Sequence, residues 1–215
     1  MVKVFFLGIP LRAVESFMAD HKVNDVRQMC TRVLGDQGLV KWRINADQSG
    51  GTQNETHVSV TLHGDTRIIT GSGNGPVDAF FRGMKAAFGP EYHSLQTIKL
   101  SEFKLEGREG TGRSSGTGTD VQAFAQVIFT NPDGKKFEFS ATHNSLTRAA
   151  FMAVLEAFIF FVNAERAFVK LREARVYALE HDKADLADGY AAQMSTLVAV
   201  VTNYADVVAA IRRRR

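Results

Sequence analysis

The chain has 215 residues, of which 45% are hydrophobic and 23% are charged, and its formal net charge is +3. This composition suits one large globular domain or two small ones and excludes a disordered or collagen-like chain. Four of the positive charges belong to the terminal arginines 212–215, so the rest of the chain is nearly neutral. We therefore expect a solvated basic tail and no nucleic-acid partner.

The cysteine content and the apolar runs indicate a cytoplasmic protein. The single cysteine, Cys30, cannot form an internal disulfide, and the opening apolar run is too short for a signal peptide. The longest apolar stretch, 149–162, is interrupted by Glu156 and falls short of the roughly 20 residues that cross a bilayer, so no membrane span is expected. No Cys/His cluster has zinc-site spacing, and we expect neither a metal nor another cofactor.

Hydrophobic periodicity and turn residues predict most elements of the first 180 residues. In chain order these are a strand at 2–9, one broken or two short helices ending at Gly35, a strand at 39–44, a loop at 48–54, a hairpin of strands 57–62 and 66–70 around Gly64-Asp65, a helix at 76–88, a strand at 95–106, a loop at 107–119, strands at 120–130 and 136–141, and a helix from Ser145 to about Glu180.

The composition of the last third of the chain predicts long helices, because residues 135–215 hold one glycine and no proline. After a turn at 182–185, apolar residues repeat with heptad spacing at Tyr190, Met194, Leu197, Val201, Tyr204, Val208 and Ile211. This seam is either the inner side of a helical hairpin or a dimer contact. The predicted fold class is α+β: two pseudo-symmetric βββα units with an added N-terminal strand and helix segment and a C-terminal helical hairpin.

The run Gly71-Ser-Gly-Asn-Gly-Pro-Val-Asp-Ala79 joins the hairpin to the next helix. It lacks the Lys-Ser/Thr ending of a P-loop, and Pro76 stands where a dinucleotide fingerprint has its third glycine. A glycine-rich turn at a helix start nevertheless points N–H groups and a positive dipole end outward, which favours a carboxylate or phosphate. A purely structural turn is the alternative.

This run, after its strand pair, resembles the signature of the carboxy-terminal regulatory (LeuA-type allosteric/dimerisation) domain of 2-isopropylmalate synthase and citramalate synthase. The segments 123–129, 136–141 and 145–161 are similar to that domain's second half. In that family the domain is a pseudo-twofold pair of βββα units that dimerises and binds leucine or isoleucine, as feedback inhibitor, near the subunit interface. The resemblance implies an N-terminal extension at 1–55, a regulatory-type unit at 56–162 and a C-terminal helical extension at 163–215.

The resemblance also implies an effector pocket whose backbone groups would hold the polar end of a ligand. Its border would be formed by Gly71, Gly73, Asn74, Gly75, Pro76 and Ala79. In the second unit Ser140-Ala-Thr-His-Asn144 replaces the family's glycine-containing loop, so effector specificity does not carry over. The 55 residues before the similar region are too few for the family's catalytic barrel of roughly 200 residues or more, so we expect no synthase reaction.

The glycine-rich loop 107–118 is either a lid over the pocket or a disordered connection. As a lid it would bring Arg108 and Arg113 to an anionic ligand.

Three of the six histidines are candidates for proton transfer. His57 and His63 lie six residues apart on one strand pattern, hence on one face, and pseudo-symmetry would let His143 approach the same region. Imidazole titrates near neutrality, and a carboxylate can orient it. If the chain is an enzyme, its catalytic residues would come from His57, His63, His143, Asp65, Asp78 and Asp120. The alternative is that these are ordinary surface histidines.

Three functional hypotheses follow. The first is a free-standing, dimeric relative of the regulatory domain that binds a small carboxylate-bearing, amino-acid-like metabolite, as a sensor for a partner enzyme or as a binding module. The second is that the effector pocket has become an active site for an isomerisation, cyclisation or hydrolysis in specialised metabolism. The third is a structural partner that stabilises another subunit through its dimer surface and the heptad seam.

Overall fold

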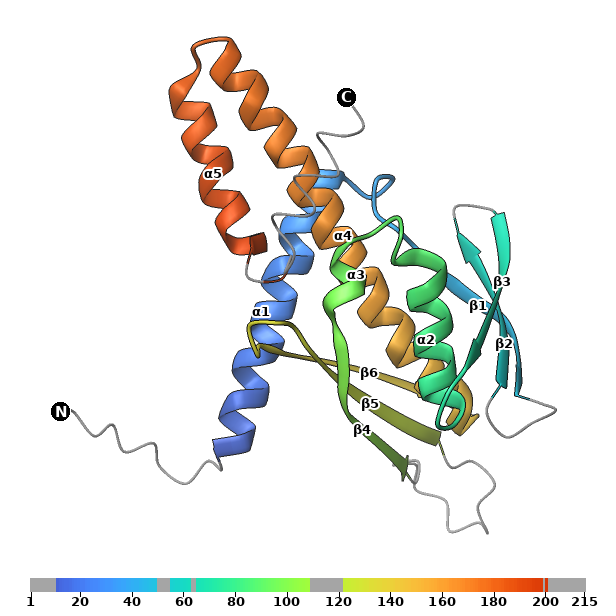
Figure 1. The fold of residues 1–215 in the computed structure, drawn as a ribbon. Coiled ribbons are helices and arrows are strands. Elements are labelled where there is room, and N and C mark those ends of the chain that lie inside the picture. Colours follow the sequence, from blue (N-terminus) through green and yellow to red (C-terminus); the bar gives the residue numbers. More distant parts are fainter. Residues whose placement is uncertain (1–10, 50–54, 63–64, 109–121, 199, 201–215) are drawn as a thin grey trace.

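The computed structural model describes residues 11–49, 55–62, 65–108, 122–198 and 200 (Figure 1). In chain order the elements are α1 (Leu11–Leu34), β1 (Arg43–Ser49), β2 (Glu55–Leu62), β3 (Asp65–Ser72), α2 (Pro76–Phe88), α3 (Ser94–Thr97), β4 (Lys99–Arg108), β5 (Gln122–Thr130), β6 (Lys136–His143), α4 (Leu146–Glu180) and α5 (Ala184–Val198).

The strands form two antiparallel three-stranded sheets, with orders β1-β2-β3 and β4-β5-β6. Each sheet is followed by a long helix, α2 after the first and α4 after the second. The predicted α+β class and the repeated strand-strand-strand-helix order are confirmed. The predicted hairpin is confirmed as well, because Leu62 pairs with Asp65 and the ladder continues from there to Glu55 and Ser72.

The two helices that follow the sheets pack against them and against each other. Figure 1 shows the first sheet beside α2 and the second sheet across the first half of α4, and α2 contacts α4. In β5 every second residue is buried, as expected for a strand with one face against a helix. The rings of Phe81 in α2 and Phe129 in β5 lie 5.6 Å apart, so the two units share one core.

The helix α4 is long and apolar enough to cross a membrane, but 67% of its most apolar stretch is buried inside the protein. It is therefore the central core helix, with α1 packed against it. Its second half forms the predicted helical hairpin with α5. Met194 and Leu197 of the heptad seam are buried there, whereas the seam positions from Val201 onward lie outside the described residues.

Several sequence-based boundaries were wrong. A single helix, α1, replaces the broken or paired helices, and it ends as predicted at Gly35, whose φ is +70°. The strand expected at 39–44 begins only at Arg43 and runs to Ser49, because the backbone of Val40 is bonded to the Asn163 side chain. The strand expected at 95–106 begins at Lys99 after the short helix α3. The loop expected at 107–119 was wrong at its start, because Gly107 and Arg108 pair with β5 and end β4. The rest of that loop and the strand expected at 2–9 lie outside the described residues.

Candidate functional site

The loop between β3 and α2 brings sheet and helix together at two glycines. A Cβ on Gly71 would lie 1.9 Å from the carbonyl oxygen of Ala79, and one on Gly73 would lie 2.6 Å from Asp78 Oδ2. These approaches are closer than any side chain allows, so only glycine lets the end of β3 pass against the first turn of α2. Gly75, the residue before the helix, has a φ of +107°, which also favours glycine.

The start of α2 is closed by a side chain from within the helix. Pro76 occupies the first helical position, as predicted, and Gly75 caps the helix without a side-chain bond. The N–H of Asn74 donates to Asp78 Oδ2 at 2.8 Å. The expectation of an open N–H is therefore wrong at Asn74, because the protein's own carboxylate already lies at the positive end of this helix.

Asp78 also holds Arg82 one turn further along α2. The Arg82 Nε donates to Asp78 Oδ1 at 3.0 Å and lies 2.9 Å from Oδ2. Burial acts to raise the pKa of the Asp78 carboxyl, but the bonds from Asn74 and Arg82 and the Arg82 charge outweigh it, so the pKa is lowered from 3.8. The side chain of Arg82 is 60% exposed and that of Asp78 28%, so both charges are accessible to a ligand.

A buried hydroxyl lies across the sheet from the first glycine. Thr56 in β2 pairs with Gly71 in β3, and its side chain has no hydrogen-bond partner although the residue is only 1% exposed. Directly paired residues of an antiparallel ladder point to the same face, so the Thr56 hydroxyl lies on the side of the sheet where Gly71 meets α2. Buried polar groups are normally satisfied, and a polar ligand or a water is the usual partner for such an exception.

Six residues were expected to border the pocket: Gly71, Gly73, Asn74, Gly75, Pro76 and Ala79. All six lie together: Gly71 near the end of β3, Gly73 to Gly75 in the loop that follows it, and Pro76 and Ala79 in the first turn of α2. Ala79 is fully buried, and it contributes the carbonyl against which Gly71 packs. Sequence reasoning missed Arg82 and Thr56: the spacing of four residues between Asp78 and Arg82 was a usable signal, whereas only the strand register reveals Thr56.

The histidines that the structure describes are not brought to a carboxylate. His57 lies on the exposed face of β2, with Nδ1 3.2 Å from the Thr70 hydroxyl. His143 ends β6, and its Nδ1 accepts the N–H of Ser145 at 3.0 Å. Of the histidines whose side chains the structure describes, namely His57, His93, His143 and His181, none pairs its ring with an aspartate or glutamate.

The remaining candidates are not described in full. His63, Arg113 and Asp120 lie outside the described residues, and for Asp65 and Arg108 only the backbone positions at the strand ends are described. Among the described residues, no three His, Cys, Asp or Glu side chains come together in a way that could hold a metal ion.

Comparison with known proteins matches most of the chain to a family model. The family model of the LeuA allosteric (dimerisation) domain matches residues 25–161, from within α1 into α4. The (R)-citramalate synthase of Streptomyces coelicolor is 32% identical over 98 residues, which cover 43% of this chain and 16% of the synthase. The chain therefore corresponds to a small part of that enzyme.

Proposed function

Because the chain belongs to the LeuA allosteric (dimerisation) domain family, we propose that it is a homodimeric regulatory module that binds a small amino-acid-like metabolite at the β3–α2 loop. Its role would be to report the concentration of that metabolite to a catalytic domain, as a cytoplasmic sensor. The similarity to part of a citramalate synthase supports this role, since that enzyme makes a small carboxylic acid.

The observation that carries the proposal is the Asp78–Arg82 ion pair beside the glycines. An amino acid has an ammonium and a carboxylate close together, and this pair offers each of them a partner of opposite charge. Arg82 is well exposed, and the Nη edge of its guanidinium can donate to a carboxylate while Nε stays bonded to Asp78. Gly73 and Gly75 have no side chains, so a ligand can approach the backbone of the loop closely.

Two further observations support ligand binding and self-association. The unpartnered hydroxyl of Thr56 would gain a hydrogen bond from a polar ligand or from a water that such a ligand orders. Large apolar side chains are exposed at Ile68 (73%), Phe103 (41%) and Leu146 (47%). Burying such side chains between two copies would remove apolar surface from water.

Thermal unfolding in the presence of leucine, isoleucine, valine and 4-methyl-2-oxopentanoate tests the binding. A true ligand at 100 times its Kd adds about 2.7 kcal/mol of stability. We expect an amino acid to bind more tightly than the oxo acid, which lacks the ammonium that Asp78 would hold. If none of the three amino acids raises the unfolding temperature, the proposal is wrong.

Two variants and one control locate the site. Arg82→Gln removes the cation, and Gly73→Ala places a methyl group against Asp78; both should weaken binding of the effective amino acid. Gly189→Ala in α5 is the matched glycine control, because a Cβ there meets nothing within 4 Å. Sedimentation at several protein concentrations tests the dimer, and a monomer at all of them would contradict that part of the proposal.

A further inference from the structure

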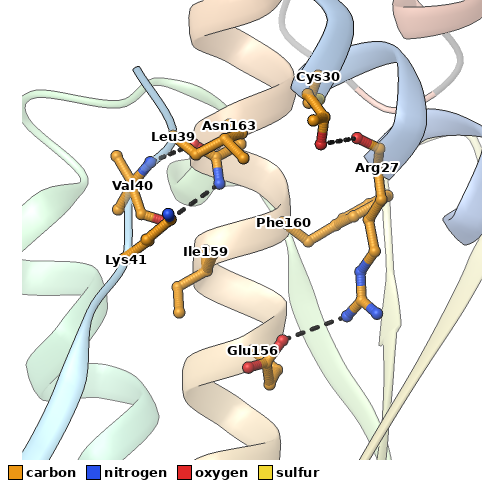
Figure 2. A pocket seen from close by; sticks show the side chains of 10 residues that line it. Arg27, Cys30, Leu39, Val40, Lys41, Glu156, Ile159, Phe160 and Asn163 are labelled. Atoms are coloured by element: carbon orange, nitrogen blue, oxygen red, sulfur yellow. Dashed lines mark hydrogen bonds and ion pairs between the residues drawn. The ribbon is translucent and has the colours of Figure 1, made fainter. Parts of the chain in front are cut away.

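A cavity lies on α4, between α1 and the segment 39–41 (Figure 2). Its volume is about 210 Å³, and none of the residues that line it belongs to the β3–α2 loop. Its floor is formed by Cys30, Val40 and Phe160, and its rim carries Arg27, Lys41 and Glu156. The site is therefore distinct from the one described above.

The deepest residues of this cavity are apolar and buried, while its mouth is open to solvent. Cys30, Val40 and Phe160 are 2%, 1% and 3% exposed, and burial raises the pKa of the Cys30 thiol to about 12, so the thiol is uncharged. An apolar cavity of about 150 Å³ is enough to bind benzene, so this cavity has room for a ligand of about six to nine non-hydrogen atoms.

The walls of the cavity are held in place by Asn163. Its side-chain oxygen accepts the Val40 N–H at 2.7 Å, and its amide nitrogen donates to the Val40 carbonyl at 3.3 Å. Figure 2 shows these two bonds on one side of α4, and Arg27 and Glu156 on the other side. Because the segment 39–41 is fixed to α4, the cavity cannot close simply by collapse of this wall.

The rim carries more positive than negative charge. Arg27 Nη2 lies 3.3 Å from Glu156 Oε2, and the two side chains are 47% and 50% exposed, so this is a weak surface pair. Lys41 is exposed and makes no ion pair with any other described residue. Two cations against one carboxylate leave one positive charge for a ligand.

We propose that this cavity binds a small monocarboxylic acid whose apolar chain lies on the partly exposed Leu39 and Ile159, above the buried Cys30, Val40 and Phe160, and whose carboxylate is attracted by the excess positive charge of Arg27 and Lys41. The apolar floor selects the chain, and the excess positive charge selects the acid over an alcohol or an amine. The inference stands independently of the ligand assigned to the β3–α2 loop.

Hexanoate is the probe, with 1-hexanol and hexylamine as ligands of the same length and different charge. The single tryptophan, Trp42, lies two residues from Val40, so its fluorescence reports on the segment 39–41, and ligand-observed NMR provides a second measurement. We expect hexanoate to bind about tenfold more tightly than hexanol, and hexylamine to bind more weakly than hexanol. Equal affinity for the three probes, or no binding of hexanoate at about 20 mM, overturns the proposal.

Two variants that break the same ion pair give opposite predictions. Arg27→Gln should weaken hexanoate binding several-fold, whereas Glu156→Gln should strengthen it because the repelling carboxylate is removed. A merely structural effect of losing the pair would shift both affinities in the same direction, and that result overturns the proposal.

Two further variants show where the acid binds. Ile159→Phe should reduce hexanoate affinity by filling the cavity, while Arg82→Gln should leave it unchanged. If Arg82→Gln abolishes hexanoate binding and Ile159→Phe does not, the acid binds at the β3–α2 loop. The cavity proposal then fails, and the proposed function is unaffected.

Discussion

The side chain of Asn163 forms two hydrogen bonds with the backbone of Val40, a residue 123 positions earlier in the chain. Both residues are buried, at 7% and 1% exposure. The amide thus takes the place that a neighbouring strand would occupy, and it joins the segment before β1 to the central helix α4. A backbone N–H and a carbonyl that would otherwise be buried without partners are both satisfied.

Replacing Asn163 with alanine should therefore be strongly destabilising. Two buried backbone groups lose their partners, and each unsatisfied group costs about 1–3 kcal/mol, so we expect a loss of about 2–6 kcal/mol in the free energy of unfolding. Urea denaturation measures this loss. Asn144→Ala is the control, because Asn144 is exposed and should change stability by less than about 0.5 kcal/mol. Similar losses in the two variants would contradict the role of Asn163.

The carboxylate of Glu165 has a comparable role two residues after Asn163 in α4. It accepts the N–H of His93 at 3.1 Å and that of Ser94 at 2.7 Å, and it is only 5% exposed. In Glu165→Gln one of these donors would face an amide NH₂ instead of an oxygen, so we expect a loss of about 1.5–3 kcal/mol in urea denaturation. The exposed Glu173 on the same helix gives the matched variant Glu173→Gln, which should be nearly neutral. A neutral Glu165→Gln would show that the carboxylate does not hold α3.

Elements set by local signals could be predicted from the sequence. The helix α4 begins where Ser145 predicts it, and the Ser145 hydroxyl accepts the N–H of Arg148 at 3.3 Å. The start of α2 follows from Gly75 and Pro76. In each case the residues that decide the structure are within a few positions of one another.

The segments that sequence reasoning missed are set by distant side chains. The alternating pattern at 39–44 suits a strand, but the Val40 backbone is bonded to Asn163. Ser94 begins a helix because Glu165, 71 residues later, binds its N–H. The candidate site likewise combines local and distant features. Its glycines could be found in the sequence, whereas the position of Thr56 depends on strand register.

Adding a methyl group at Gly71 should be far more damaging than at Gly189. In Gly71→Ala the new Cβ would overlap the Ala79 carbonyl, so β3 and α2 must separate, and we expect a cost of about 3 kcal/mol or more. In Gly189→Ala the Cβ meets nothing, and a helical glycine replaced by alanine should gain about 0.5–1 kcal/mol. Thermal unfolding distinguishes the two, and equal effects would contradict the close approach.

The Asp78 carboxylate should make stability depend on pH in the acidic range. Its pKa is lowered from 3.8 in the folded protein, so its stabilising contribution is complete above about pH 4 and is lost as the pH falls through the folded-state pKa. The difference in unfolding free energy between the wild type and Asp78→Asn should therefore be larger at pH 6 than at pH 3. Arg82→Gln should reduce this pH dependence only in part, since the bond from Asn74 remains. An equal difference at both pH values would show that the carboxylate is not held in its charged form.

Cys30 should be nearly inert in the folded protein and reactive once the chain unfolds. Burial raises the pKa of its thiol from 9.0 to about 12, so the reactive thiolate at pH 8 is reduced about a thousandfold. The residue is also only 2% exposed. Reaction with an aromatic disulfide reagent at pH 8 should be slow for the native protein and complete within minutes in 8 M urea. Because the unfolded chain ionises first, the free energy of unfolding should also fall as the pH rises above about 9. In Cys30→Ala the free energy of unfolding should fall less steeply above about pH 9, because no thiol ionises. A rapid, stoichiometric reaction of the native protein would show instead that α1 opens readily away from α4.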